Sequence, residues 1–68
     1  MHLRAGEDNE WRAYDVYLDG LLLTNCVEAD DLGGWVRVEK PANERGTIFD
    51  LKTIYGQVQF RPKVIGGR

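Results

Sequence analysis

The feature that most constrains the fold of this chain is an Asp-Gly pair at residues 19–20, which stands between two stretches of alternating residues. Such a pair is among the strongest short-range signals of a β-hairpin, because the tight primed turn needs a positive φ at both of its central residues. Side chains alternate between two faces along residues 14–18 before the turn and along residues 21–28 after it. The sequence therefore predicts a β-hairpin over residues 14–28, with apolar side chains on both faces near the turn.

The same period of two predicts three further strands, at residues 35–40, 47–52 and 53–61. Pro41 and Pro62 follow the first and the last of these, where a residue without an N–H ends the ladder. Gly56 falls inside the last strand and indicates a bulge or a close approach of another backbone. No segment has ten or more residues of helical period. The pattern predicts an all-β fold, a small single-domain barrel or sandwich of about five antiparallel strands.

The chain of 68 residues is long enough for one small domain with a thin core. Residues 1–12 are mostly polar and are expected to form a flexible N-terminal arm, and residues 62–68 are expected to form a loose tail. Cys26 is the one cysteine, so no disulfide can form within the chain. Because association stabilises a native state, we expect self-association or docking onto another protein to support so small a core.

The sequence lacks the side chains that most enzyme mechanisms need. It contains no serine, which excludes a Ser-His-Asp triad. His2 and Cys26 form the one Cys/His pair. His2 lies in the expected flexible arm, which cannot hold its imidazole in position to act as the base for the thiol. A single histidine and a single cysteine also cannot build a zinc site of the usual kind. We therefore predict no enzyme, no cofactor, no metal and no small-molecule substrate.

No stretch of the sequence is apolar enough to suggest a membrane partner. The longest wholly apolar run is Leu21-Leu22-Leu23, whereas a spanning helix needs ~20 such residues. The first twelve residues also lack the apolar centre of a signal peptide. We expect a protein that is soluble in the cytoplasm and has no membrane partner.

Charge is divided unevenly along the chain. Residues 1–34 have a net charge of −6 and residues 35–68 a net charge of +4, which leaves −2 for the whole chain. Such a division permits steered contacts between oppositely charged surfaces. Large aromatic residues and arginines are also the usual anchors of protein interfaces. We predict a non-enzymatic protein-interaction module that binds a protein partner or itself, with these candidate docking residues: Tyr17, Leu22, Trp35, Arg37, Tyr55 and Arg61.

A second hypothesis is a small β-barrel that binds single-stranded nucleic acid. Such barrels stack bases on aromatic side chains beside a basic groove, and the residues that would do so here are Trp35, Arg37, Tyr55 and Arg61. The net negative charge opposes this hypothesis, because nucleic-acid-binding domains are usually basic. A purely structural interpretation is that Trp35 and Tyr55 cover the thin core. Nucleic acid is therefore an alternative partner that the sequence does not favour.

Residues 14–60 combine short motifs in a fixed order: a Tyr-x-Val strand, an Asp-Gly turn, a valine before an Ala-Asp pair, a Gly-Trp-Val run and a Gly-x-Val strand. The residues that carry them are Tyr14, Val16, Asp19, Gly20, Val27, Ala29, Asp30, Gly34, Trp35, Val36, Gly56 and Val58. This order resembles a family of small proteins of unassigned function that tailed bacteriophages and prophages encode. The resemblance implies a virion or assembly component, found in the cytoplasm of a bacterial host or in the virion, and it implies no catalytic residue.

Overall fold

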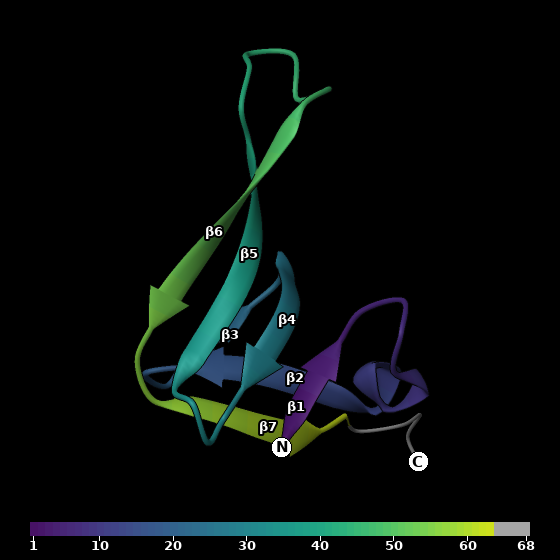
Figure 1. The fold of residues 1–68 in the computed structure, drawn as a ribbon, viewed down its shortest axis with the longest axis vertical. Helices are drawn as coiled ribbons and strands as arrows, with labels where there is room; N and C mark the ends of the chain where they lie inside the picture. Colours follow the sequence, from purple (N-terminus) through teal and green to yellow (C-terminus); the bar gives the residue numbers. More distant parts are fainter. Residues whose placement is uncertain (64–68) are drawn as a thin grey trace.

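The computed structural model describes residues 1–63, which form an all-β domain of seven short strands with one 3-10 helix (Figure 1). The elements are β1 (His2–Arg4), η1 (Asn9–Ala13), β2 (Tyr14–Leu18), β3 (Leu21–Leu23), β4 (Cys26–Asp30), β5 (Trp35–Pro41), β6 (Phe49–Tyr55) and β7 (Val58–Pro62). The all-β class that the sequence predicts is confirmed.

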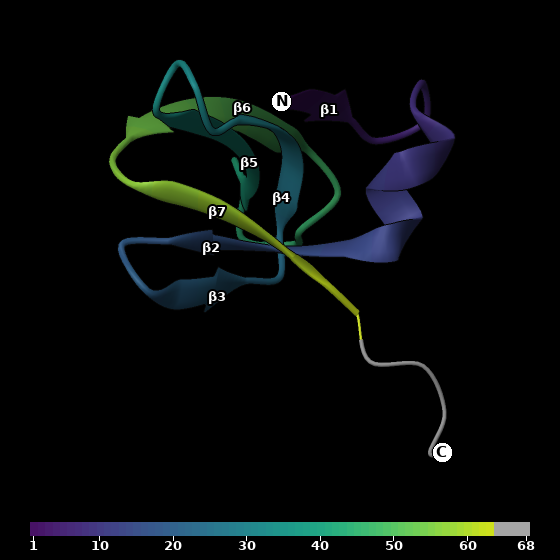
Figure 2. The ribbon, with the colours of Figure 1, turned by 90° about the horizontal axis from the view of Figure 1, so that it is seen from below.

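The strands form two antiparallel sheets that pack as two layers. The four-stranded sheet has the order β1-β4-β5-β6, and the three-stranded sheet has the order β3-β2-β7. The strands of one sheet run across those of the other (Figure 1), and the turned view shows the two layers one above the other (Figure 2). Within residues 1–63 the sheets do not close into a barrel. Of the two predicted architectures, the structure therefore has the sandwich.

A small core fills the space between the sheets. Val16 and Val58 enter it from the three-stranded sheet, and Ala29, Val36 and Val38 enter it from the four-stranded sheet. Six partly buried side chains pack against this cluster: Trp11, Leu18, Leu23, Cys26, Ile54 and Phe60. The largest side chain that is fully buried is only a valine, Val36. The core is therefore thin, and most of the large apolar side chains stay partly or fully exposed.

The Asp19-Gly20 turn has the geometry that the sequence predicts. The φ angle is 51° at Asp19 and 84° at Gly20, as the primed turn between two right-twisted strands requires. The turn closes a hairpin in which β2 pairs with β3, with Leu18 opposite Leu21. Aspartate tolerates a positive φ better than most residues because its short side chain can bond locally.

The prediction of one return strand over residues 21–28 is wrong. β3 ends at Leu23, and the chain then crosses to the other sheet, where β4 pairs with β5. Asn25 holds the crossing, because its Nδ2 donates to the backbone oxygen of Glu39 (2.9 Å) and its own backbone oxygen accepts the N–H of Glu39 (3.0 Å). Alternation continues across residues 24–25, so the pattern gives no sign of the change of sheet.

The predicted division of the C-terminal strands between residues 52 and 53 is also wrong. One strand, β6, spans this point in the four-stranded sheet, and β7 belongs to the three-stranded sheet. The break falls at Gly56, where an added Cβ would lie 2.8 Å from Leu18 Cδ1. Gly56 therefore does mark a close approach, but the atoms that an added Cβ would meet are side-chain atoms of Leu18 and Asp19 and not another backbone. β5 matches its predicted strand to within one residue.

Asp19, in the turn of the β2–β3 hairpin, forms two hydrogen bonds to Gln57, which lies between β6 and β7. Its Oδ1 accepts the N–H of Gln57 (2.9 Å), and its own N–H donates to the backbone oxygen of Gln57 (2.8 Å). The N–H of Gly56 donates to the backbone oxygen of Gly34 (3.0 Å). The Asp-Gly turn therefore anchors the connection between the two sheets as well as reversing the chain.

The expected flexible arm is wrong for most of residues 1–12. β1 pairs with β4, where Leu3 lies opposite Ala29 and is 5% exposed. Burial of this leucine stabilises a strand that is otherwise short and polar, and η1 then leads directly into β2. Pro62, which is expected in the tail, is the last residue of β7. Residues 64–68 of the predicted loose tail lie outside the described residues.

Candidate functional site

The candidate site consists of the side chains of the four-stranded sheet that point away from the core, which we call the outer face. In β5, Val36 and Val38 enter the core, so Trp35 and Arg37 point the opposite way. The pairing of β5 with β6 places Tyr55 beside Trp35. The outer face comprises His2, Arg4, Glu28, Asp30, Trp35, Arg37, Glu39, Phe49, Leu51, Thr53 and Tyr55.

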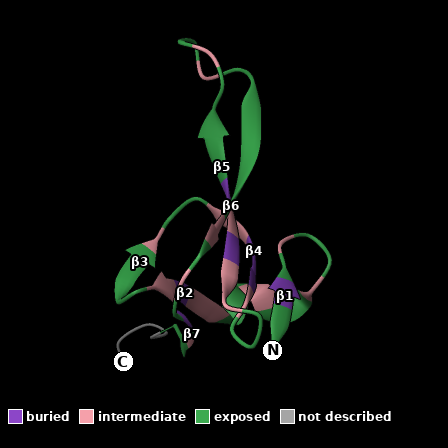
Figure 3. Ribbon diagram, turned by 60° about the vertical axis from the view of Figure 1, so that its left-hand side comes forward, coloured by how far each residue is buried: buried purple, intermediate pink, exposed green. Residues whose placement is uncertain are grey.

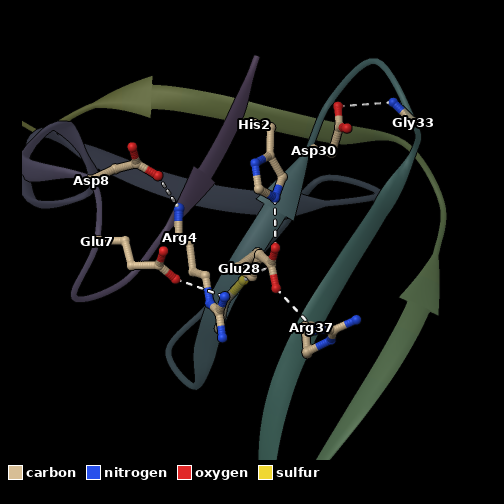
Figure 4. A network of polar contacts seen from close by, with 9 residues as sticks. His2, Arg4, Glu7, Asp8, Glu28, Asp30, Gly33 and Arg37 are labelled. Atoms are coloured by element: carbon tan, nitrogen blue, oxygen red, sulfur yellow. Dashed lines mark hydrogen bonds and ion pairs between the residues drawn. The ribbon is translucent and has the colours of Figure 1, made fainter.

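A buried carboxylate lies at the centre of the outer face (Figure 4). Glu28 is 7% exposed, and its two oxygens have separate partners. Oε2 lies 2.6 Å from His2 Nε2, and Oε1 accepts a hydrogen bond from Arg37 Nη1 at 3.0 Å. The three side chains come from β4, β1 and β5, which are neighbours in the sheet. Glu28 therefore holds Arg37 against the sheet and compensates its charge.

Trp35 is fixed between two of these partners. The His2 ring centroid lies 5.6 Å from that of Trp35, and the guanidinium carbon of Arg37 lies 5.7 Å from the indole centroid. A guanidinium at this distance from an indole gains a cation–π attraction. The indole is half-buried, so one part of it contributes to the fold and the other is presented on the outer face.

The far ends of β5 and β6 project from the domain as a two-stranded hairpin, residues 39–51, which we call the arm (Figure 1). Figure 3 shows the arm exposed along almost its whole length. Ile48, Phe49 and Leu51 are 58%, 54% and 57% exposed, and Tyr55 at the base of β6 is 74% exposed. Phe49 and Leu51 continue the outer face beyond Tyr55. Among residues 1–63 no further layer covers these apolar side chains. An isolated two-stranded hairpin is marginally stable in water.

The six docking residues expected from the sequence fall into two groups on different sheets. Trp35, Arg37 and Tyr55 come together on the outer face. Tyr17 and Leu22 pair on the three-stranded sheet; the other member of this second group is Arg61. The guanidinium carbon of this arginine lies 4.2 Å from the Tyr17 ring centroid. The structure therefore does not bring Arg61 to Trp35, because the chain changes sheet between β6 and β7.

A hollow of about 250 Å³ lies on the outer face beside the base of the arm. Its lining includes Arg4, Glu28, Arg37 and Leu51. Both arginines already have carboxylate partners, since Arg4 Nη1 lies 2.7 Å from Glu7 Oε2 and Arg37 is bonded to Glu28. The positive charges around the hollow are therefore compensated within the chain, and Glu39 adds a further carboxylate to the lining. This arrangement opposes the capture of a free anion.

Cys26 and Asp30 lie near the outer face and could in principle be reactive, but both have structural roles. Cys26 packs against the core, its Sγ lies 3.2 Å from the backbone oxygen of Glu28, and burial raises the pKa of its thiol. The carboxylate of Asp30 accepts the N–H groups of Gly33 and Leu32, which lower its pKa and form the turn after β4. Neither side chain is arranged for nucleophilic or general-base chemistry.

The sequence reasoning missed three parts of this surface. Glu28 is the last residue of the predicted hairpin, and His2 is expected in a flexible arm, yet the two meet in the buried pair described above. Phe49 and Leu51 alternate with Asp50 and so have the pattern of a strand with a buried face, but no layer covers that face among residues 1–63. The sequence feature that could have indicated the arm is the long loop between β5 and β6, because a long connection allows the hairpin to project from the domain.

Comparison with known proteins finds no match: no protein-family model, no curated protein and no solved structure matches the chain. Among residues 1–63, no helix is long and apolar enough to span a membrane. In the same part of the chain, no group of three or more His, Cys, Asp or Glu side chains is placed to hold a metal ion. Function is therefore inferred from the geometry and chemistry of the chain itself.

Proposed function

We propose that this chain is a non-enzymatic protein-interaction module that docks a protein through its outer face and arm. The observation that carries the proposal is the arm itself. It projects from the thin core and leaves Ile48, Phe49 and Leu51 more than half exposed. Exposed apolar side chains gathered on one element in this way mark interaction sites in soluble proteins.

The composition of the outer face supports the same conclusion. Trp35, Arg37 and Tyr55 belong to the residue types that anchor protein interfaces. Glu28 fixes the arginine, and the arginine and His2 fix the indole. Side chains that are already ordered lose little conformational entropy on binding, which raises the affinity of a preorganised surface.

We further propose a phage or prophage setting, in which the module is part of a virion or of its assembly in the host cytoplasm. The support is the sequence resemblance over residues 14–60. Genes for capsid, portal or terminase proteins beside the gene for this chain are the expected neighbourhood. A neighbourhood of unrelated chromosomal genes contradicts the phage setting and leaves the docking surface untouched.

The competing function is the binding of single-stranded nucleic acid. It needs free basic groups beside the stacked aromatics, but Arg37 is paired with Glu28 and Arg61 lies on the other sheet. We expect no binding of labelled single-stranded DNA at low salt. Binding that weakens steeply as salt rises, as phosphate contacts require, would favour nucleic acid over a protein partner.

A pull-down from the cells that produce the protein tests the docking surface, with the chain itself counted among the partners. The variant Leu51→Asp places a charge on the outer face at the base of the arm. Leu32→Asp is the matched control, because Leu32 is also exposed, at 89%, but lies in the turn before β5. We expect the partner bound by the wild type to be kept by the control and lost by Leu51→Asp. Equal binding by all three proteins, each folded, contradicts the proposed surface.

A further inference from the structure

β6 is the longest free edge of either sheet. The edge strands are β1 and β6 in the four-stranded sheet and β3 and β7 in the three-stranded sheet. β6 has seven residues, whereas the other three have five or fewer. A long exposed edge is a template for pairing with another strand, and natural proteins usually shorten or cover such edges.

The backbone groups that face this free edge can be identified from the ladder with β5. The backbone oxygen of Ile48 accepts the N–H of Ala42, and the N–H of Gly56 donates to Gly34. The register between these points is unbroken, and hydrogen-bonded and non-bonded pairs alternate along an antiparallel ladder. The even-numbered residues of β6 therefore bond to β5. The N–H and C=O groups of Phe49, Leu51, Thr53 and Tyr55 point to the free edge.

The sequence of β6 is complementary to itself in one antiparallel register. If Leu51 lies opposite Leu51 of a second chain, then Asp50 lies opposite Lys52 on both sides of the centre. The same register puts Phe49 opposite Thr53. The centre is then a pair of residues that both present free backbone groups, as a hydrogen-bonded pair requires. Neither Asp50 nor Lys52 forms an ion pair within residues 1–63.

We propose that a second copy of this chain pairs along β6, antiparallel and centred on Leu51, to give a two-fold dimer. The proposal rests on the proposed function, since it names the partner that the arm binds. Pairing of the two β6 strands joins two four-stranded sheets into one continuous sheet. Residues opposite each other in an antiparallel pair lie on the same face, so the two outer faces form one surface with Phe49 and Leu51 of both chains at its middle.

Charged side chains on an edge strand often prevent pairing. A single lysine on an edge strand opposes pairing, because pairing with a second copy places it beside another lysine or removes it from water. In β6 the two charges are opposite in sign and two residues apart. The register centred on Leu51 therefore converts both into cross-strand attractions.

Charge reversal tests the register directly. Lys52→Asp leaves two acids on each β6, and Asp50→Lys leaves two lysines, so each variant alone should self-associate at least about tenfold more weakly than the wild type. Mixing the two variants restores both attractions and should give a heterodimer. Lys63→Asp is the control, because Lys63 follows β7 in the other sheet, away from the free edge of β6; it should dimerise like the wild type. Light scattering after gel filtration measures the mass of each sample.

The proposal is overturned if the wild type is a monomer at millimolar concentration, or if the mixed variants stay monomeric while each is folded. A dimer that both single variants leave intact also overturns it, because that dimer uses another surface. These results do not decide the proposed function. A monomeric chain whose arm binds a different protein, lost in Leu51→Asp, keeps the module and rejects only the second copy as its partner.

Discussion

Glu28 is the one charged side chain among residues 1–63 that is buried. Replacing it with alanine leaves Arg37 and His2 without their shared partner and opens space on the sheet. Arg37 is 37% exposed in its side chain and can regain water, so we expect Glu28→Ala to lower the free energy of unfolding by about 1–3 kcal/mol, less than for a fully buried pair. Urea denaturation measures the change. Glu44→Ala, in the exposed tip of the arm, should stay within about 0.5 kcal/mol of the wild type; equal effects of the two substitutions contradict the role of Glu28.

Asp19 has two separate roles, a positive φ and a hydrogen bond to Gln57. Asn keeps an acceptor oxygen and tolerates the same backbone, whereas Ala loses the acceptor and strains the turn. We expect Asp19→Ala to lower the free energy of unfolding by about 1–2 kcal/mol and Asp19→Asn to lower it by less than about 0.5 kcal/mol. Thermal and urea unfolding of both variants measure this. A loss of similar size in Asn would show that the carboxylate charge matters more than the acceptor and the turn.

The rate at which Cys26 is alkylated tests whether its thiol is buried. Burial raises the pKa of its thiol above the ordinary value of 9.0, and the thiolate is the form that reacts. We therefore expect alkylation of the folded protein to be slower at pH 8 than that of the urea-unfolded chain, and to rise with pH only above the range of an exposed thiol. Mass spectrometry of the iodoacetamide adduct measures the rates. Equal rates in the folded and unfolded chains would place the thiol in water.

The arm extends the four-stranded sheet beyond the core, and none of its residues belongs to the buried cluster. Lys40 and Asp50 are opposite each other, so an Asn-Gly turn in place of residues 41–49 closes the hairpin on a pair that suits a two-residue loop. We expect this shortened chain to fold with a free energy of unfolding within about 1 kcal/mol of the wild type. Circular dichroism and urea denaturation measure it. Loss of cooperative unfolding would show that the arm supports the core.

The elements also show what the sequence can predict here. The turn at residues 19–20 follows from Asp and Gly, because few residues accept a positive φ. The strands follow from alternation, which reports the face of each residue but not the sheet to which a strand belongs. The changes of sheet at residues 24–25 and at Gly56 depend on contacts far along the chain, with Glu39 and Asp19 respectively. For that reason the predicted docking residues separate into two groups.

At the scale of the whole molecule, the thin core and the exposed arm both favour association with a second chain. A chain of 68 residues with a core of small side chains has little stability to spare. Pairing of two β6 strands would add stability that rises with the logarithm of protein concentration, because a bound partner stabilises the native state by mass action. It would also place Leu51 of the two chains side by side on one continuous outer face.

Amide hydrogen exchange along β6, followed by NMR at several protein concentrations, tests the central claim most directly. The N–H groups of residues 50, 52 and 54 face β5 and should be protected at every concentration. The N–H groups of residues 49, 51 and 53 face the free edge, and their protection should appear as the concentration rises, with Leu51 at the centre. Free exchange of Leu51 at the highest concentration, with the even-numbered residues still protected, would contradict pairing along β6.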